Sequence, residues 1–391
     1  MRMRKSIQGG FSLIELMIAI TLGGVILAGV LGTVLASKRS FTVQNETSNI
    51  QASYRFAMEF LSRDIRLAGY AGCASPYKTS FANMLTAAKL DNSSSFKQGS
   101  ISVAETEDAR LLYADRYGIR GISGYENGQL ATEFPGFNTS STTSDAIIIR
   151  FADPDRAMRV ATQSLASQHF EVFDNAIITT GTNLVAVNSN CRDVSLFQAT
   201  SVSAGGATSR DTIGYAPSST SLTPNCSSVI KANEGSYLNC TESACGSTSC
   251  ANPSPTSPSA FSRGSTLMPY EVAVFYIEAS NVVPGANALK RTVLSGANSV
   301  TEELVLGADE LQITYGIDTS PIPDGVLDTF VEATAVPDWN RIVSVRFEFL
   351  ARSMERVLDI GQVQTLADGT PMPADGYLRE KIAHTVRLRN R

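Results

Sequence analysis

The first strong feature of the hydrophobic pattern is an apolar run from Phe11 to Ala36, in which Glu15 is the only charged residue. A helix of those 26 residues would be roughly 39 Å long at about 1.5 Å per residue, enough to cross a bilayer core of about 30 Å. Three basic residues and no acid precede the run: Arg2, Arg4 and Lys5. The pattern therefore predicts one membrane-spanning helix with its N-terminal side in the cytoplasm.

A secretory signal peptide and a plain membrane anchor are the alternatives for this run. A signal peptide has an apolar region of about 7–15 residues and a small-x-small cleavage site. This run is longer, and no Ala-x-Ala follows it. A plain anchor leaves Glu15 unexplained, because a carboxylate there costs a few kcal/mol unless it is neutral or paired. Cleavage between Gly10 and Phe11 would create an α-amine four residues from Glu15, in the same chain or in a neighbouring copy.

Beyond Ser37 the pattern becomes amphipathic. Apolar residues recur mostly at three- and four-residue steps, at Phe41, Ile50, Ala57, Leu61, Ile65 and Ala68, with Phe56 and Phe60 widening the stripe. Charged residues stand between them: Arg55, Glu59, Arg63, Asp64 and Arg66. No proline occurs before Ser75, so one helix is predicted to run from the membrane to about Leu67 and to end at Gly69 and Gly72. The simplest role of its apolar stripe is packing against a sheet.

Strand patterns dominate the later part of the chain. Val272–Ile277 is apolar and Leu311–Tyr315 alternates. Ile342–Leu350 alternates strongly, with Val343, Val345, Phe347 and Phe349 on one face. A last strand is expected at 385–389. One long N-terminal helix followed by many strands predicts an α+β fold in which the helix packs on an antiparallel sheet.

Composition divides the chain further. Residues 78–144 are irregular, and residues 201–265 are rich in small polar residues and contain four cysteines. We read the second range as a disulfide-stapled loop insertion, with a floppy spacer as the alternative. The expected parts are listed in chain order: leader 1–10, membrane helix 11–36, amphipathic helix 37–70, first α+β part 71–200, insertion 201–265 and C-terminal β part 266–391.

Charge and cysteine content narrow the function classes. The net charge is −5, and removal of the three basic leader residues would make it −8, which argues against bulk binding of nucleic acid. Six cysteines lie beyond the membrane run: Cys73, Cys191, Cys226, Cys240, Cys245 and Cys250. On the far side of the membrane they are expected to form disulfides, for which 15 full pairings exist. A zinc cluster fits poorly, because Cys-x2-Cys spacing and nearby histidines are missing.

Catalytic motifs are lacking. The sequence has no Gly-x-Ser-x-Gly, His-Glu-x-x-His, Gly-x4-Gly-Lys or Gly-x-Gly-x-x-Gly, and its two histidines, His169 and His384, are expected to be surface or interface residues. We expect no enzyme. An acidic run offers one metal hypothesis, since Asp318, Asp324 and Asp328 surround a Gly turn and calcium prefers such oxygen ligands. The alternative is a tight hairpin between the strand at Leu311 and one at Phe330.

The N-terminal residues resemble the type IV pilin-like superfamily, whose signature is a basic leader ending in Gly, then Phe-Ser/Thr-Leu-Ile-Glu and an apolar helix. Here that is Gly10 followed by Phe11-Ser12-Leu13-Ile14-Glu15. The resemblance implies that a prepilin peptidase cuts after Gly10 and methylates the amine of Phe11. It also implies that the helix leaves the inner membrane and packs into a filament core, with Glu15 serving assembly.

Further stretches resemble PilW-type minor pilins. They are Leu61–Cys73, Ser144–Phe151, Ser189–Cys191 with Val194–Thr200, Glu302–Asp318 and His384–Arg391. Because Cys73 and Cys191 both fall in such stretches, we predict that they pair, and that the four cysteines of the insertion pair among themselves. A disulfide closing a loop that long contributes about 4–5 kcal/mol in the chain-entropy model.

The resemblance implies a minor pilin that primes a type IV pilus and lies at its tip, with roles in twitching motility and adhesion. Its expected partners are other minor pilins, the major pilin, a large tip adhesin, the prepilin peptidase and, before assembly, the inner membrane; no nucleic acid is expected. The domain would be periplasmic before assembly and then at the cell surface. The alternatives are a J-type pseudopilin of a type II secretion system and an adhesin module on a pilin anchor.

Overall fold

The structure is a computed structural model. It describes residues 12–74, 80–83, 114–115, 118–119, 121–134, 137, 143–173, 178–205, 210–216, 225, 260–295 and 298–389. The chain forms two compact units. Unit 1 consists of Met1–Ala52 and Ser353–Glu380, and unit 2 of Ser53–Arg352 and Lys381–Arg391.

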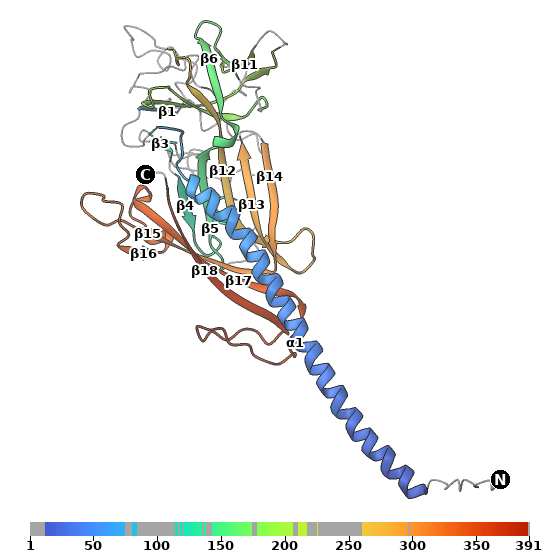
Figure 1. The fold of residues 1–391 in the computed structure, drawn as a ribbon. Coiled ribbons are helices and arrows are strands. Elements are labelled where there is room, and N and C mark those ends of the chain that lie inside the picture. The colour runs from blue at the N-terminus through green and yellow to red at the C-terminus, as the bar shows by residue number, and fades with distance from the viewer. Residues whose placement is uncertain are drawn as a thin grey trace, which may run out of the picture. The chain divides into compact units, whose positions relative to one another are not determined.

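One long helix, α1, covers Leu13–Leu67 (Figure 1). It holds no proline and ends where Gly69 and Gly72 adopt φ values of 72° and 67°. These left-handed conformations suit glycine and stop the helix. The predicted single helix and its predicted end are both confirmed.

In unit 1, the segment Ser353–Glu380 accompanies the first part of α1; we call this segment the arm. It contains the end of β17 (Ile342–Arg356), the start of β18 (Tyr377–Arg387) and the folded-back segment between them. The part of the arm that follows β17 and the part that returns to β18 are joined by backbone hydrogen bonds. These run from Val357 N–H to Gly376 O (2.9 Å), from Gly361 N–H to Ala374 O (3.0 Å) and from Met372 N–H to Gln364 O (2.7 Å). The arm therefore has an ordered backbone structure of its own.

Unit 2 contains a large sheet built around β12 (Thr266–Ala279). The other strands of this sheet are β1 (Ser80–Asn83), β4 (Ile122–Tyr125), β5 (Ala146–Ala152), β6 (Met158–Ser164), β7 (His169–Val172), β8 (Asn183–Val187), β9 (Asp193–Gln198), β10 (Ser201–Ser203), β11 (Asp211–Gly214), β13 (Asn287–Ser295) and β14 (Asn298–Leu306). Short elements beside them are β2 (Ala114–Asp115), β3 (Gly118–Ile119), α3 (Gln129–Glu133) and a 3-10 turn, η2 (Pro154–Arg156).

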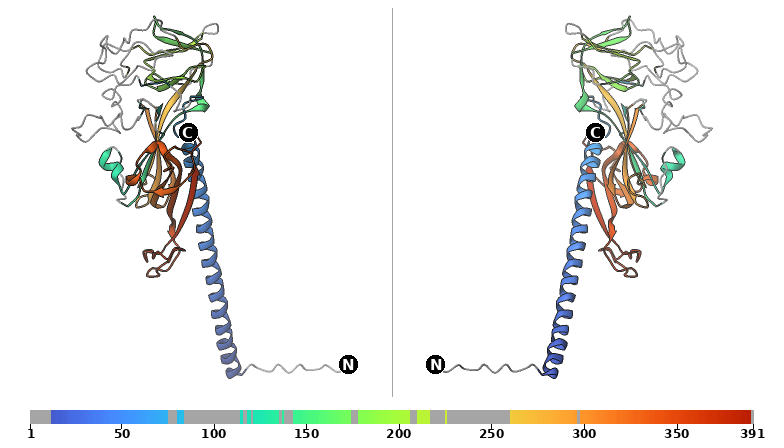
Figure 2. Two further views of the ribbon diagram at one scale, coloured as in Figure 1. Left: turned by 90° about the vertical axis from the view of Figure 1, so that its left-hand side faces the viewer. Right: turned by 90° about the vertical axis from the view of Figure 1, so that its right-hand side faces the viewer.

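β12 joins two groups of strands within this sheet. Its first residues pair with β8 and β6, as in Leu267 with Ala186 and with Met158. Its later residues pair with β5 and β13, as in Val274 with Ile148. Figure 2 shows the green strands gathered at one end of β12. Most pairs are antiparallel, whereas β1 and β9 run parallel.

Each strand group has its own apolar core. One core, at the β6–β11 end, contains a cluster of aromatic rings. Between ring centroids, Phe170 lies 5.5 Å from Phe197 in a stacked pair, 5.3 Å from Tyr215 and 5.9 Å from Phe261. The other core lines β5, β8, β9 and β12 and includes Phe134 and Phe137. Such ring pairs add about 0.5–1.5 kcal/mol each beyond the burial of their area.

The range 201–265, predicted as a loop insertion, is not entirely loop. β10 and β11 lie inside it, and β11 pairs with β7 through Ile213 and Phe170. Residues 217–259, apart from Asn225, lie outside the described residues. The boundaries predicted for the parts of the chain stay predictions.

A second sheet in unit 2 has the order β16-β15-β17-β18, where β15 is Ala308–Ile317 and β16 is Thr329–Val331. Two 3-10 turns, η4 (Ala333–Ala335) and η5 (Trp339–Arg341), connect β16 to β17. The predicted alternation in β17 is confirmed from Val345 to Phe349, where buried residues alternate with the more exposed Arg346 and Glu348. Val343 is buried as predicted, but Ile342 and Ser344 on the opposite face are buried as well. The last strand was predicted too short: β18 begins at Tyr377, where pairing with β17, rather than the local pattern, supports the strand.

Candidate assembly interface

The apolar half of α1 has its side chains exposed on all sides. Every large apolar side chain from Leu13 to Leu35 is more than half exposed. This helix is long and apolar enough to cross a membrane by length and composition. Burial of apolar surface is worth about 25 cal/mol per Å², so this half of α1 favours a lipid or protein environment over water.

Glu15 lies in the first turn of α1. The backbone N–H of Glu15 donates to Ser12 O at 3.0 Å, which places Ser12 at the start of the helix. An acid in the first turn is favoured by the helix dipole. Within the described residues Glu15 has no ion pair, whereas Gly10 and Phe11, the predicted processing site, lie outside them. The role predicted for Glu15 stays a prediction.

Four glycines in this half of α1 have open space beside them. A Cβ atom added at Gly23, Gly24, Gly29 or Gly32 would meet nothing within 4 Å. The fold of one chain therefore does not require glycine at these positions. In a membrane or a helical assembly, small residues let a second helix approach closely.

Within unit 2, a disulfide fixes the end of α1 to the strands. Cys73 and Cys191 are bonded, as predicted, with their Cα atoms 5.3 Å apart. Cys191 lies in the turn between β8 and β9, where its φ of 59° is in the left-handed region. The other four cysteines (Cys226, Cys240, Cys245 and Cys250) lie outside the described residues, so their predicted pairing is untested.

The last turns of α1 pack on the sheet through a buried ion pair. Arg291 Nε on β13 lies 2.8 Å from Asp64 Oδ2, and only 1% of Asp64 is exposed. Burial raises the pKa of Asp64, while the charge of Arg291 opposes that rise. The Arg291 guanidinium also lies 5.9 Å from the ring centres of Phe60 and Phe275.

This contact corrects the predicted helix faces. Asp64 was placed among the polar residues, but it stands three residues after Leu61 and seven after Ala57, on the buried stripe. Helical spacing was the signal that could have found it. At the other extreme, Phe41 was assigned to the apolar stripe and is 70% exposed, and Phe56 is half exposed.

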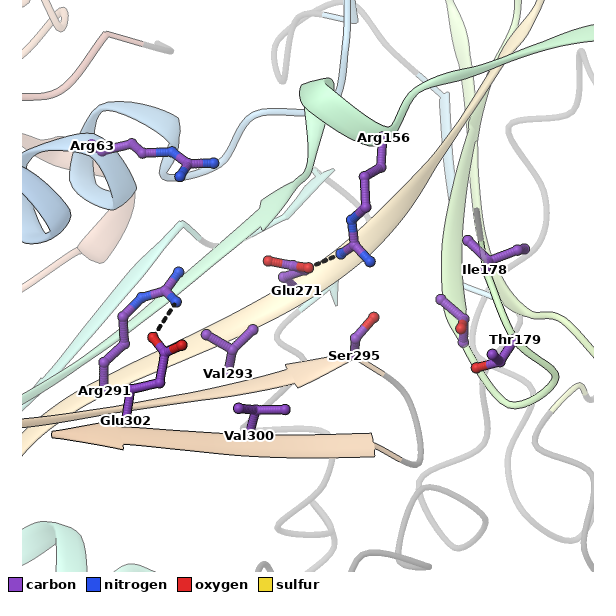
Figure 3. Close-up of a pocket in the computed structure, with 11 residues that line it drawn as sticks. Arg63, Arg156, Ile178, Thr179, Glu271, Arg291, Val293, Ser295, Val300 and Glu302 are labelled. Atoms are coloured by element: carbon purple, nitrogen blue, oxygen red, sulfur yellow. Dashed lines mark hydrogen bonds and ion pairs between the residues drawn. The ribbon is translucent and has the colours of Figure 1, made fainter. Parts of the chain in front are cut away.

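Beside this contact lies a groove of about 530 Å³ (Figure 3). Arginines and carboxylates face one another across it, with Arg156 paired to Glu271 and Arg291 Nη1 3.8 Å from Glu302. Val293 and Val300 line its apolar part. These charged side chains are thus paired with one another, which is more typical of structural polar contacts than of a reactive centre.

The three aspartates of the metal hypothesis accept hydrogen bonds from residues of their own loop. Asp318 accepts hydrogen bonds from Gly325 N–H (2.7 Å) and Ser320 N–H (3.0 Å), and these bonds, led by that of Gly325, lower its pKa. Asp324 accepts from Val326 N–H (2.8 Å), and Asp328 accepts from Thr319 N–H (2.7 Å).

These bonds build a hairpin loop, and β15 and β16 pair through Tyr315 and Val331. The hairpin alternative is therefore the one that the structure contains. Among the residues described, no group of three or more His, Cys, Asp or Glu side chains is placed to hold a metal ion. The calcium hypothesis stays a prediction.

The two histidines lie apart from the features above. His169 begins β7, partly exposed, with its Nδ1 atom 3.4 Å from Ser167 O, and His384 is exposed on β18. Both positions agree with ordinary surface residues.

Comparison with known families gives two matches. The family model of the type IV pilus-assembly protein W matches residues 274–390, and that of the prokaryotic N-terminal methylation motif matches residues 5–31. They confirm the resemblance found at both ends of the chain. Together they support a pilin related to the type IV pilus, anchored in a membrane by its N-terminal helix and interacting with other pilus components. No curated protein and no solved structure matches the chain.

Proposed function

We propose that this protein is a non-enzymatic minor pilin, PilW-like, that primes a type IV pilus and forms part of its tip complex. The observation that carries the proposal is the combination of a methylation motif, an exposed apolar helix and a match to a pilus-assembly family in one chain. The large head, mostly unit 2, supports a rare subunit, because a repeating subunit would have to accommodate that bulk at every position.

In this proposal a prepilin peptidase cuts after Gly10 and methylates the new amine of Phe11. Before assembly, α1 holds the protein in the inner membrane as a single-pass protein with its head in the periplasm. The helix then leaves the bilayer and packs among the helices of other minor pilins and the major pilin, beneath a large tip adhesin. The protein acts in pilus assembly, in twitching motility and in adhesion.

Glu15 supports a particular position of this protein relative to other pilins. A carboxylate without a partner within the described residues is suited to the N-terminal amine of a neighbouring subunit. Such a pairing removes most of the cost of an ionised acid in an apolar environment. We therefore place this protein beneath or beside another pilin and not alone at the top of the tip.

Deletion of the gene, with complementation by the full chain, tests the function. The proposal expects surface pili and twitching to disappear and to return on complementation, with secretion of exoproteins unchanged. Lost secretion with normal pili would instead support a J-type pseudopilin. Normal pili with lost attachment would support an adhesin module.

A further inference from the structure

The arm is fastened to α1 at two points within unit 1. Arg39 Nη2 lies 2.5 Å from Asp359 Oδ2, and Gln51 Nε2 donates to Glu380 Oε1 at 3.2 Å. The two helix positions are 12 residues apart, about 18 Å along the axis at 1.5 Å per residue. The arm therefore follows α1 from the level of Gln51 down to the level of Arg39.

Arg39 lies just past the end of the apolar run. It stands three positions after Ala36, which is about 4.5 Å of helix. The headgroup region on each side of a bilayer is roughly 5–7 Å thick, because a core of about 30 Å lies in a membrane of about 40–45 Å. The run of about 39 Å is longer than the core of about 30 Å, so Arg39 lies about 3 Å beyond the core when the helix tilts by about 40°, and about 9 Å beyond it when the run is upright and centred. The ion pair between Arg39 and Asp359 therefore lies in the headgroup layer or at its outer edge.

The arm presents apolar side chains at this depth. Ile360 follows Asp359 directly and is 75% exposed, and Val363 is 57% exposed. A turn shapes the segment, since Gln362 N–H donates to Asp359 O at 3.0 Å and Gly361 has a φ of 94°. No charged residue occurs between Asp359 and Asp368, so the segment carries no charge that would oppose contact with lipid.

The helix contributes matching groups at the same level. Phe41 is exposed, and aromatic side chains are favoured at membrane interfaces. Lys38, also exposed, has no ion pair within the part of the chain that the structure describes. Arg39 pairs with Asp359, and Lys38 beside it is a further exposed cation, which favours an anionic surface.

We propose that the tip of the arm, Asp359–Val363, is a membrane-surface contact that rests in the headgroup layer of an anionic bilayer before assembly. Lipid is the expected occupant because the exposed apolar tip is fastened to the helix one turn beyond the membrane span. The contact fixes the arm against the membrane, and it is lost when α1 is extracted. This inference goes beyond the proposed function and does not depend on the place of the protein at the pilus tip.

The test is lipid quenching of a fluorescent probe in the full-length protein. An environment-sensitive fluorescent amino acid replaces Gln362, or, as a control, Ile322, which is 83% exposed in the hairpin loop between β15 and β16. The protein is reconstituted in vesicles of phosphatidylethanolamine and phosphatidylglycerol (about 3:1) containing a headgroup spin-labelled lipid. We expect quenching at position 362 to be at least about three-fold stronger than at position 322. Equal quenching at the two positions would overturn the proposal.

Two variant pairs sharpen the result. Ile360→Asp with Val363→Asp is expected to reduce quenching at position 362 to the level of the control, whereas Ile360→Leu with Val363→Leu retains it. Arg39→Glu is expected to release the arm, and the added change Asp359→Arg to restore its quenching. If the probe in the double aspartate variant were quenched as strongly as in the parent protein, lipid contact by the tip would be excluded.

A second copy of the chain is the alternative to lipid as the contact of the arm tip. Dilution of the protein in the vesicles distinguishes these two contacts. Quenching by lipid stays constant when the protein-to-lipid ratio falls about ten-fold. Quenching that depends on a contact between copies decreases on this dilution, and that result would overturn the proposal. Flotation of every variant with the vesicles confirms that α1 is inserted. The assay uses no pilus, so its outcome is independent of piliation in the deletion strain.

Discussion

Glu15 is the only charged residue in the apolar run, so its substitution tests whether its charge serves assembly. Glu15→Ala removes the acid without disturbing insertion, because an apolar side chain is favoured in the bilayer. If a neighbour's amine pairs with Glu15, we expect at least about a ten-fold loss of surface pili, counted by electron microscopy. Glu59→Ala is the control, since Glu59 is an exposed acid in the same helix. Wild-type piliation by Glu15→Ala would contradict the pairing and the placement beneath another pilin.

Asp145 makes the stability of unit 2 depend on pH. It accepts hydrogen bonds from Ile313 N–H (2.8 Å) and Asn127 N–H (3.1 Å), yet burial raises its pKa from 3.8 to about 6. The folded state binds the proton more tightly than the unfolded state, so this group lowers the free energy of unfolding as pH rises from about 4 to about 6. The full effect is about 3 kcal/mol, at 1.36 kcal/mol for each pKa unit.

Denaturant unfolding at several pH values in that range measures this dependence. Asp145→Asn keeps the size of the side chain and removes its titration, so we expect a smaller fall in unfolding midpoint between pH 4 and 6 than in the parent protein. Asp324→Asn, in an exposed loop, is the matched control and should leave the fall unchanged. An identical pH dependence of all three proteins would show that Asp145 does not titrate in this range.

At the scale of elements, the disulfide between Cys73 and Cys191 joins the end of α1 to the β8–β9 turn across a separation of 118 residues. In the chain-entropy model such a loop stabilises the folded state by about 5 kcal/mol. We expect Cys73→Ser and Cys191→Ser each to lower the free energy of unfolding by a similar amount, measured by denaturant titration of the full chain in detergent. The double variant should lose little more than either single one. Additive losses would indicate that each cysteine acts separately.

Elements with a regular local pattern were the ones that the sequence could predict. The length of α1 and its end follow from missing proline and from Gly69 and Gly72, and the faces of β17 follow from alternation. β10 and β11 were missed because short polar strands are held by pairing with β7 and not by local pattern. The same reason explains the late start predicted for β18.

The residues proposed for processing and assembly belong to one motif. Gly10, Phe11 and Glu15 lie within one short stretch, so a linear signature suggests them from the sequence alone. Arg39 and Asp359 are far apart in sequence, and nothing local predicts their ion pair. Asp64 shares the helical spacing of the buried stripe, but its partner, Arg291, lies on a distant strand that no local pattern indicates. Contacts that depend on tertiary pairing therefore need the structure.

At the scale of the whole molecule, the size of the head bears on the proposed number of copies in a filament. Cleavage after Gly10 would leave 381 residues, and all but the first part of α1 lie outside the apolar run. A minor, tip-located subunit avoids repeating this bulk along the shaft. Purified pili are therefore expected to contain this protein in far fewer copies than the major pilin, about one per filament, by quantitative mass spectrometry.

Immunogold labelling of pili distinguishes a subunit at the tip from a subunit along the shaft. Gold-labelled antibody against the head should mark filament ends, and a tag on the major pilin, which marks the whole shaft, is the positive control. Shearing pili into shorter pieces should lower the labelled fraction of ends, because only one end of each original filament carries the tip. Label spread evenly along the shaft would contradict a tip subunit and would favour a structural repeat.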